Sequence, residues 1–364
     1  LRMSVSSTQF ALDLLRSSSD SSSNFVISPF SLGSALAIVH DGAKDDTQSE
    51  LTQLLAKDHS PEEVTALYSK LSNDLSSTNS EGVTTAVANR FFLDQSFDLL
   101  SEYEEHVDKT YGAGVEKLEF SDGQLCADRV NGFVNEKTEE MIPEVVNADM
   151  FQDASAILVN AVYFKGQWTK TFEPENTVDK TFYGINADRE IPFMSQKIST
   201  RYSISPDFTA VSLPYMDTNC SLVILMPSSD FSSWREELSA DSLLNTIKGR
   251  KHSHFQLELP KFKIESETDG RASLEKCGVT KLFSSEANLS GISSGPLRVS
   301  KIVHKAVIDV SEEGTEAAAA TAVIMVEKCL IMSIHEPINI TIDRPFIYSI
   351  VRGNEDIVFI GQYC

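Results

Sequence analysis

Apolar residues recur at helical spacing through much of the first third of the chain. Residues 9–16 place Phe10 and Leu14 on one side of a short helix, with further apolar positions between them. The same spacing returns in three later stretches. The helical predictions are residues 9–16, 49–57 and 61–75 in this region and 130–140 beyond it.

A break separates the first two of these helices. Residues 17–23 are a serine-rich loop, and residues 24–31 are a β-like run that Pro29 stops. Ser31 then lies where a side chain would cap the following helix.

Strands are predicted between the helices from about residue 82, and short strands dominate after residue 164. Residues 83–94 are dense in β-branched and aromatic side chains, and 154–164 is almost wholly apolar, as expected of a strand covered on both faces. No internal repeat and no linker divides the chain, so helices first and strands afterwards predict one α+β domain over residues 1–364. The remaining predicted strands are 208–214, 221–227, 255–264, 302–310, 338–342, 346–351 and 357–361.

Charge narrows the classes of partner. The 364 residues include 31 Lys and Arg against 53 Asp and Glu, a net charge of -22, which repels a phosphate backbone and argues against nucleic acid. One basic island, residues 248–252, could touch a polyanion, although a solvated turn is the simpler interpretation. No apolar stretch reaches the ~18 residues that span a bilayer, and no signal peptide is visible. We therefore expect neither nucleic acid nor a membrane as a partner.

The reactive side chains form no recognisable catalytic or metal-binding motif. Residues 291–295 match the G-x-S-x-G of hydrolases, but a polar loop precedes them and Pro296 follows, whereas that motif needs a strand before it and a helix after it. We expect no enzymatic activity, no metal and no cofactor. The cysteines are odd in number, widely spaced and without a C-x-x-C pair, which excludes a disulfide scaffold. They are Cys126, Cys220, Cys277, Cys329 and Cys364.

The segment from Glu312 to Lys328 differs from its neighbours. Gly314 supplies backbone freedom, and the alanines that follow favour helix but have no amphipathic face. Such a segment could push between two paired strands, because larger side chains would overpack the core there. An exposed Ala-rich loop or a short helix is the alternative. Read at period two, one face holds only small or β-branched residues, namely Thr315, Ala317, Ala319, Thr321 and Val323.

In this segment the sequence resembles the serpins, a family of serine-protease inhibitors, and the resemblance extends over essentially the whole chain. Residues 312–321 are very close to the hinge of inhibitory serpins. The resemblance implies a single domain with three β-sheets, about nine helices and an exposed reactive-centre loop at about residues 312–337. Seven other blocks match in the family's order: 24–31, 160–168, 259–262, 288–291, 303–306, 343–346 and 359–361.

The resemblance also implies roles for individual residues. The hinge would be Glu312, Glu313, Gly314, Thr315, Glu316, Ala317, Ala318, Ala319, Ala320 and Thr321. The shutter, which controls opening of the main sheet, would be Ser28, Pro29, Ser31, Asn160 and His304. The breach at the top of that sheet would include Trp168 and Lys261, with Lys261 paired to Glu312.

The implied activity is inhibition by a suicide-substrate mechanism, in which the cleaved loop inserts into the main sheet. Counting about fourteen residues from Gly314 puts the scissile bond between Lys328 and Cys329, which suits a trypsin-like protease. Met325 and Met332 are alternatives that suit a chymotrypsin-like protease. A non-inhibitory serpin, acting as carrier, chaperone or storage protein, is the alternative function.

The expected state is a monomer whose partner is its target protease. An extracellular location is slightly favoured, and an intracellular one stays open. Glycosylation would depend on the compartment. The sequons begin at Asn219, Asn288 and Asn339.

Overall fold

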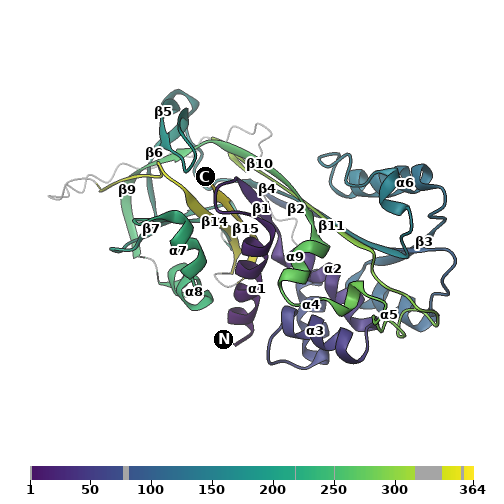
Figure 1. Cartoon of the computed structure of the whole chain (residues 1–364). Coiled ribbons are helices and arrows are strands. Elements are labelled where there is room, and N and C mark those ends of the chain that lie inside the picture. Colours follow the sequence, from purple (N-terminus) through teal and green to yellow (C-terminus); the bar gives the residue numbers. More distant parts are fainter. Residues whose placement is uncertain (1, 77–81, 218, 250, 316–337, 354–355) are drawn as a thin grey trace.

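A computed structural model describes residues 2–76, 82–217, 219–249, 251–315, 338–353 and 356–364 (Figure 1). The α-helices in this part are α1 (Arg2–Ser18), α2 (Pro29–Gly42), α3 (Asp45–Leu55), α4 (Pro61–Ser76), α5 (Ser101–Tyr111), α6 (Gly123–Lys137), α7 (Phe231–Glu237), α8 (Ala240–Lys248) and α9 (Gly270–Lys276). Short 3-10 turns lie at η1 (Ala148–Phe151), η2 (Pro174–Asn176) and η3 (Lys281–Phe283). None of the described helices is both long and apolar enough to cross a membrane.

The strands form two hydrogen-bonded networks. The six-stranded network has the order β10-β11-β12-β4-β2-β3. Its strands are β2 (Val83–Asp94), β3 (Gly114–Leu118), β4 (Ala156–Gln167), β10 (Phe262–Asp269), β11 (Lys301–Val310) and β12 (Gly314–Thr315). Strands β4 and β11 run parallel and are the central pair. We call this network the main sheet.

The nine-stranded network has the order β1-β15-β14-β8-β7-β6-β9-β13, with β5 also paired to β6. The long strand β6 pairs with β5 and β9 along most of its length and with β7 only at its end. The three predicted sheets are therefore the main sheet and the two parts of this network that meet at the end of β6. Its strands are β1 (Phe25–Ile27), β5 (Val178–Tyr183), β6 (Asp188–Ile204), β7 (Phe208–Pro214), β8 (Cys220–Pro227), β9 (Lys251–Pro260), β13 (Ile338–Thr341), β14 (Phe346–Arg352) and β15 (Asp356–Tyr363).

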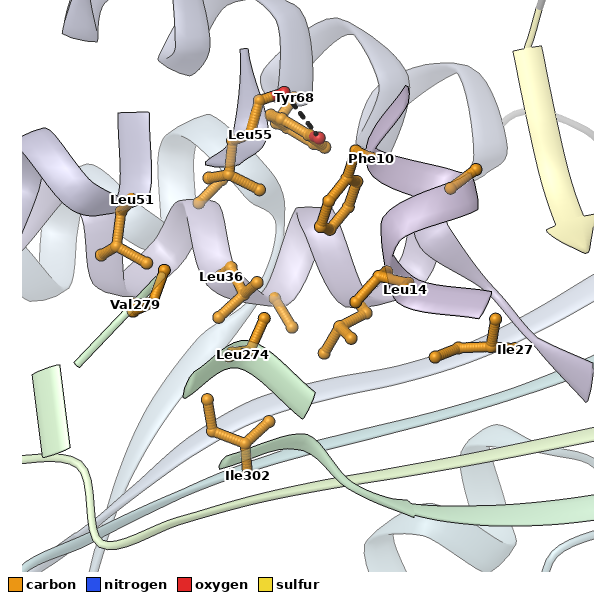
Figure 2. Close-up of a cluster of buried hydrophobic side chains, with 14 of the residues drawn as sticks. Phe10, Leu14, Ile27, Leu36, Leu51, Leu55, Tyr68, Leu274, Val279 and Ile302 are labelled. Atoms are coloured by element: carbon orange, nitrogen blue, oxygen red, sulfur yellow. Dashed lines mark hydrogen bonds between the residues drawn. The ribbon is translucent and has the colours of Figure 1, made fainter. Parts of the chain in front are cut away.

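The main sheet has apolar cover on both faces. Alternate side chains of β4 point in opposite directions, so Leu158 joins the helical core while Val159 packs with the residues of α6. This double cover explains why β4 reads as an almost continuous apolar run. Figure 2 shows the helical core, where side chains from α1–α4 and α9 meet Ile302 of β11. The residues labelled there are Phe10, Leu14, Ile27, Leu36, Leu51, Leu55, Tyr68, Leu274, Val279 and Ile302.

The predicted helix cap at Ser31 is wrong, because the cap of this helix lies earlier in the sequence. Helix α2 begins at Pro29, whose missing N–H is no loss at a helix start. The cap is Ser28, and its hydroxyl accepts a hydrogen bond from the N–H of Ser31 at 3.1 Å. Ser31 thus lies in the first turn of the helix and not before it.

Several other predictions also differ from the structure. The run 255–264 is two strands, β9 and β10, in different networks, and between them the N–H of Lys261 bonds to the carbonyl of Pro192. Helix α1 continues to Ser18, which shortens the serine-rich loop. The basic island is the end of α8 and the start of β9, with residue 250 outside the described part, so it is more than a turn.

Candidate functional site

A row of polar side chains crosses the buried centre of the main sheet. In the strand register Asn160 of β4 lies opposite Asn89 of β2 on one side and His304 of β11 on the other. Asn160 and His304 are fully buried. The Asn160 side chain donates to Asn89 Oδ1 and, at 2.6 Å, to Ser31 Oγ of α2, while its Oδ1 contacts His304 Nδ1. One amide therefore connects three strands of the sheet and a helix.

The hydrogen bonds specify the protonation state of His304. The backbone N–H of Ser28 donates to His304 Nε2 at 3.1 Å, so Nε2 carries a lone pair and the ring is neutral with its proton on Nδ1. That proton points at the carbonyl oxygen of Asn160. Burial lowers the pKa of His304 to about 3. Protonation of the ring would remove the acceptor that Ser28 requires.

Ser28 extends this network to the second sheet. Its hydroxyl donates to the carbonyl of Val358 in β15 at 2.7 Å while accepting from Ser31 as the helix cap. Pro29, at the first position of α2, is buried beside it. The predicted shutter residues thus come together in the structure, where they join β4, β11, β15 and the start of α2. We call this the shutter network.

The central strands separate at one end of the main sheet. Strands β4 and β11 pair directly from Ile157 with Lys301 to Tyr163 with Val307. Beyond Tyr163 the short strand β12 lies between them, antiparallel to both. Thr315 there is opposite Val310 on one side and Gly166 on the other. The first residues of the predicted hinge therefore already occupy the space between the two strands.

Gly314 is the residue that the close approach requires. A Cβ atom at this position would lie 2.0 Å from the carbonyl oxygen of Gly166, and the φ angle of Gly314 is +151°. Both facts exclude a side chain, because the contact is with backbone that cannot move aside cheaply. The hinge can enter the sheet here only with glycine.

Thr315 follows with its side chain directed inward. It is fully buried, and its hydroxyl is 2.8 Å from the hydroxyl of Tyr215. The Tyr215 ring stacks on Trp168 with 4.6 Å between centroids, and the Trp168 Nε1–H donates to the carbonyl of Ser311 at 2.9 Å. Burial raises the pKa of Tyr215 well above its ordinary range, so its hydroxyl stays protonated. Trp168 and Tyr215 thus contact the chain at the start of the hinge, through Ser311 and Thr315.

Glu312 anchors the chain before it enters the sheet. Its carboxylate accepts from Lys261 Nζ at 2.8 Å and from Thr177 Oγ1 at 2.9 Å, and its backbone carbonyl accepts from the N–H of Phe172. Burial raises the pKa of Glu312, but the hydrogen bonds from Lys261 and Thr177 outweigh burial and the net shift is downward. The predicted pair of Glu312 and Lys261 is therefore present, at a rim where Lys261 is 43% exposed.

Sequence comparison places this architecture in a known family. A family model described as serpin (serine protease inhibitor) matches residues 5–364. The chain belongs to the serpin family. The description of this family model names serine protease inhibitors.

The related proteins match this serpin over almost its whole length. Iripin-2 of Ixodes ricinus is 33% identical over 372 residues, which cover 99% of this chain and 93% of the relative. Leukocyte elastase inhibitor A of Mus musculus is 34% identical over 383 residues, covering 100% and 99%. Among solved structures, Serpin48 of Tenebrio molitor has a TM-score of 0.85 at 29% identity, covering 99% of this chain and 96% of that one.

Several of the predicted serpin residues lie outside the described part of the chain. These are the hinge residues 316–321, the predicted scissile bond between Lys328 and Cys329, and the alternatives Met325 and Met332. Of the hinge, Glu312, Glu313, Gly314 and Thr315 are described, and the carbonyl of Glu313 accepts from the N–H of Trp168 at 3.0 Å.

The sequence reading missed two residues of the site. Asn89 is a polar residue within the predicted strand 83–94, which is the one signal that could have indicated it. Tyr215 carried no comparable signal, because a tyrosine after a short strand is common in any core.

The remaining motifs of the sequence are the G-x-S-x-G match and the glycosylation sequons. Residues 291–295 contain no strand and no helix, and Ser293 is fully buried, so the strand–turn–helix that a hydrolase nucleophile needs is absent there. Of the sequons, Asn219 and Asn339 are exposed, whereas the Asn288 side chain donates to Asp45 at 2.7 Å.

Proposed function

We propose that this serpin inhibits serine proteases as a suicide substrate. The observation that supports this most strongly is the position of β12, where Gly314 and Thr315 already lie between β4 and β11. The residues that follow in the same period are small or β-branched, as a strand entering a packed sheet requires. The relative Leukocyte elastase inhibitor A of Mus musculus supports the same class of function.

The proposed reaction uses the chemistry of the protease. The catalytic serine attacks the carbonyl of the scissile residue, the peptide bond to the next residue breaks, and an ester joins the protease to the new C-terminus of the loop. The loop before the cut then extends β12 toward the shutter network, which carries the attached protease along the sheet. Insertion requires β4 and β11 to separate along their directly paired stretch, from Ile157 to Tyr163 on β4.

We propose Lys328 as the scissile residue and a trypsin-like protease as the target. A lysine side chain suits a specificity pocket that holds a buried carboxylate. Met325 and Met332 are the competing positions, and each would direct the inhibitor to a protease with an apolar pocket instead.

The test is a reaction with trypsin followed by denaturing electrophoresis. We expect an SDS-resistant band at the summed mass of protease and serpin, and mass spectrometry of the released fragment should place Cys329 at its N-terminus. Lys328→Glu should abolish the complex with trypsin, and the matched control Lys328→Arg should keep it. Cleavage without any complex, at every ratio of the two proteins, would contradict inhibition.

A further inference from the structure

Helix α5 is bonded to the last turns of α2 by polar groups that take no part in the shutter network. The Tyr103 hydroxyl donates to the carbonyl of Ile38 at 2.6 Å. Further along α5, His106 Nε2 lies 2.8 Å from Asp41 Oδ2, and the Tyr111 hydroxyl donates to the same oxygen at 2.8 Å. Three side chains of α5 therefore hold it against α2. We call these contacts the α5 clasp.

Asp41 is the centre of the α5 clasp. Its side chain is only 4% exposed. Its other oxygen accepts from Thr65 Oγ1 of α4 at 2.6 Å and lies 3.1 Å from His40 Nδ1. Burial raises the pKa of Asp41, but the hydrogen bonds from its four partners outweigh burial, so the net shift is downward and the carboxyl group is ionised at neutral pH. A buried carboxylate requires such donors, because its desolvation is otherwise uncompensated.

Helix α5 belongs to one side of the main sheet. It connects β2 to β3, and these strands pair with each other and, through β2, with β4. The start of α2 is tied to the other side, since Ser28 bonds to His304 of β11 and to the carbonyl of Val358 in β15. A further bond joins α2 to Asn160 of β4 within the shutter network. The α5 clasp thus links elements from opposite sides of the β4–β11 pair.

Insertion of a strand would pull these elements apart. A strand added between β4 and β11 separates them by one further strand spacing, about 4.8 Å. Strands β2 and β3 move with β4 because the three form one hydrogen-bonded unit, and α5 moves with the strands that it connects. Ser28 meanwhile keeps α2 with β11 and β15. Hydrogen bonds cannot span such a displacement, so the α5 clasp has to open.

We propose that the α5 clasp is a conformational lock that slows opening of the main sheet. This inference rests on the proposed insertion of the loop, and it assigns part of the barrier to residues outside the hinge and the shutter network. The lock lies at the end of α2, whereas the shutter network lies at its start, so α2 restrains the β4 side at both ends. Each hydrogen bond removed from the clasp should speed opening about fivefold, the factor that corresponds to one buried hydrogen bond of ordinary strength.

The experiment measures uptake of a peptide by the intact protein without protease. The probe is a synthetic peptide with the sequence of residues 316–327, EAAAATAVIMVE, labelled with fluorescein at its N-terminus. Its small period-two side chains suit the space between β4 and β11. Fluorescence polarisation follows the rate of uptake, and native electrophoresis shows whether the labelled protein is monomeric. A peptide of the same composition in scrambled order is the control for non-specific binding.

Phenylalanine variants locate the lock. Tyr103→Phe and Tyr111→Phe each remove one hydroxyl from the α5 clasp and keep the ring, so each should speed uptake about fivefold, and the double variant should be faster than either. The matched control is Tyr68→Phe, because the buried Tyr68 hydroxyl bonds to the carbonyl of Leu55 and joins α4 to α3. This control should take up the peptide at the wild-type rate, even where urea unfolding shows a similar loss of stability.

Three results would overturn the proposal. They are equal rates of uptake in the wild type and both clasp variants, an equal acceleration in Tyr68→Phe, and no uptake by any of these proteins. Thermal melting shows whether each variant is folded, and either clasp variant alone tests the lock. Failure of the proposed inhibition is a different outcome, because it appears as cleavage by trypsin without a complex while the clasp variants still take up the peptide faster.

Discussion

Replacing His304 with glutamine should remove a large part of the protein's sensitivity to mild acid. The ring is fully buried and accepts a hydrogen bond from Ser28, so the folded protein holds it neutral, with a pKa of about 3. In the unfolded chain a histidine has an ordinary pKa of about 6.5. The unfolded state therefore binds a proton that the folded state does not.

The sign and size of the effect follow from this difference. Stability from the neutral ring is fully present above pH 6.5 and is lost as the pH falls from there toward 3, because protonation favours the unfolded chain. At pH 5 the unfolded state gains about 2 kcal/mol relative to pH 7, and the slope approaches about 1.4 kcal/mol per pH unit. Glutamine cannot take up a proton, so this contribution disappears in the variant.

Urea unfolding at several pH values between 7 and 5 measures the effect. Wild-type protein should lose about 2 kcal/mol more than His304→Gln over this range, whatever the variant costs at pH 7. The other ionisable groups are the same in both proteins, so their contributions cancel in the comparison. The control His252→Gln changes an exposed histidine of β9 and should follow the wild-type profile. If His304→Gln loses as much stability as the wild type between pH 7 and 5, the neutral ring is not the origin of acid sensitivity.

Three further predictions concern the hinge. Thr315→Arg should convert the inhibitor into a substrate, because an unpaired charge would enter a fully buried position; the number of serpin molecules consumed per protease should rise, and an unchanged number would refute it. Tyr215→Phe should lower the free energy of unfolding by about 1 kcal/mol, since it leaves the Thr315 hydroxyl without its partner; urea unfolding checks this, and no change would mean that the contact is not maintained in solution. Lys261→Ala should lower the same free energy by less than about 1 kcal/mol, because the pair with Glu312 is at a partly exposed rim; a loss of several kcal/mol would show that the rim pair holds the sheet together.

Strand boundaries were predicted best where glycine or proline marks the end of the strand. Strand β2 has the predicted bounds, and Gly82 marks its start. Strand β7 also has the predicted bounds and closes at Pro214. The run 255–264 failed because the change of sheet at Lys261 depends on a hydrogen bond to Pro192, more than sixty residues away, and local composition does not encode that contact. The helix cap failed for a more local reason, since both Ser28 and Ser31 are good caps and only the backbone decides between them.

The sequence indicated which types of residue form the site, but not which of these residues contact one another. The resemblance to serpins pointed to Asn160 and His304, and the small residues of the hinge have a period-two pattern of their own. Their connections depend on register, which brings Asn89 opposite Asn160 and is not readable from one strand alone. The contact between Tyr215 and Thr315 joins residues one hundred positions apart, so it too required the fold.

The shutter network and the hinge both lie at the boundary between the paired strands β4 and β11, which we call the seam. The network crosses it at Asn160 and His304, in the middle of the directly paired stretch. The hinge opens it beyond Tyr163, where Thr315 takes the place of a strand-to-strand contact. An inserting loop must therefore break the Asn160–His304 contact after advancing only a few residues past Thr315. A variant of the shutter should change the rate of insertion, while a variant of the hinge should decide whether insertion begins, and comparing the two kinetically separates their roles on one seam.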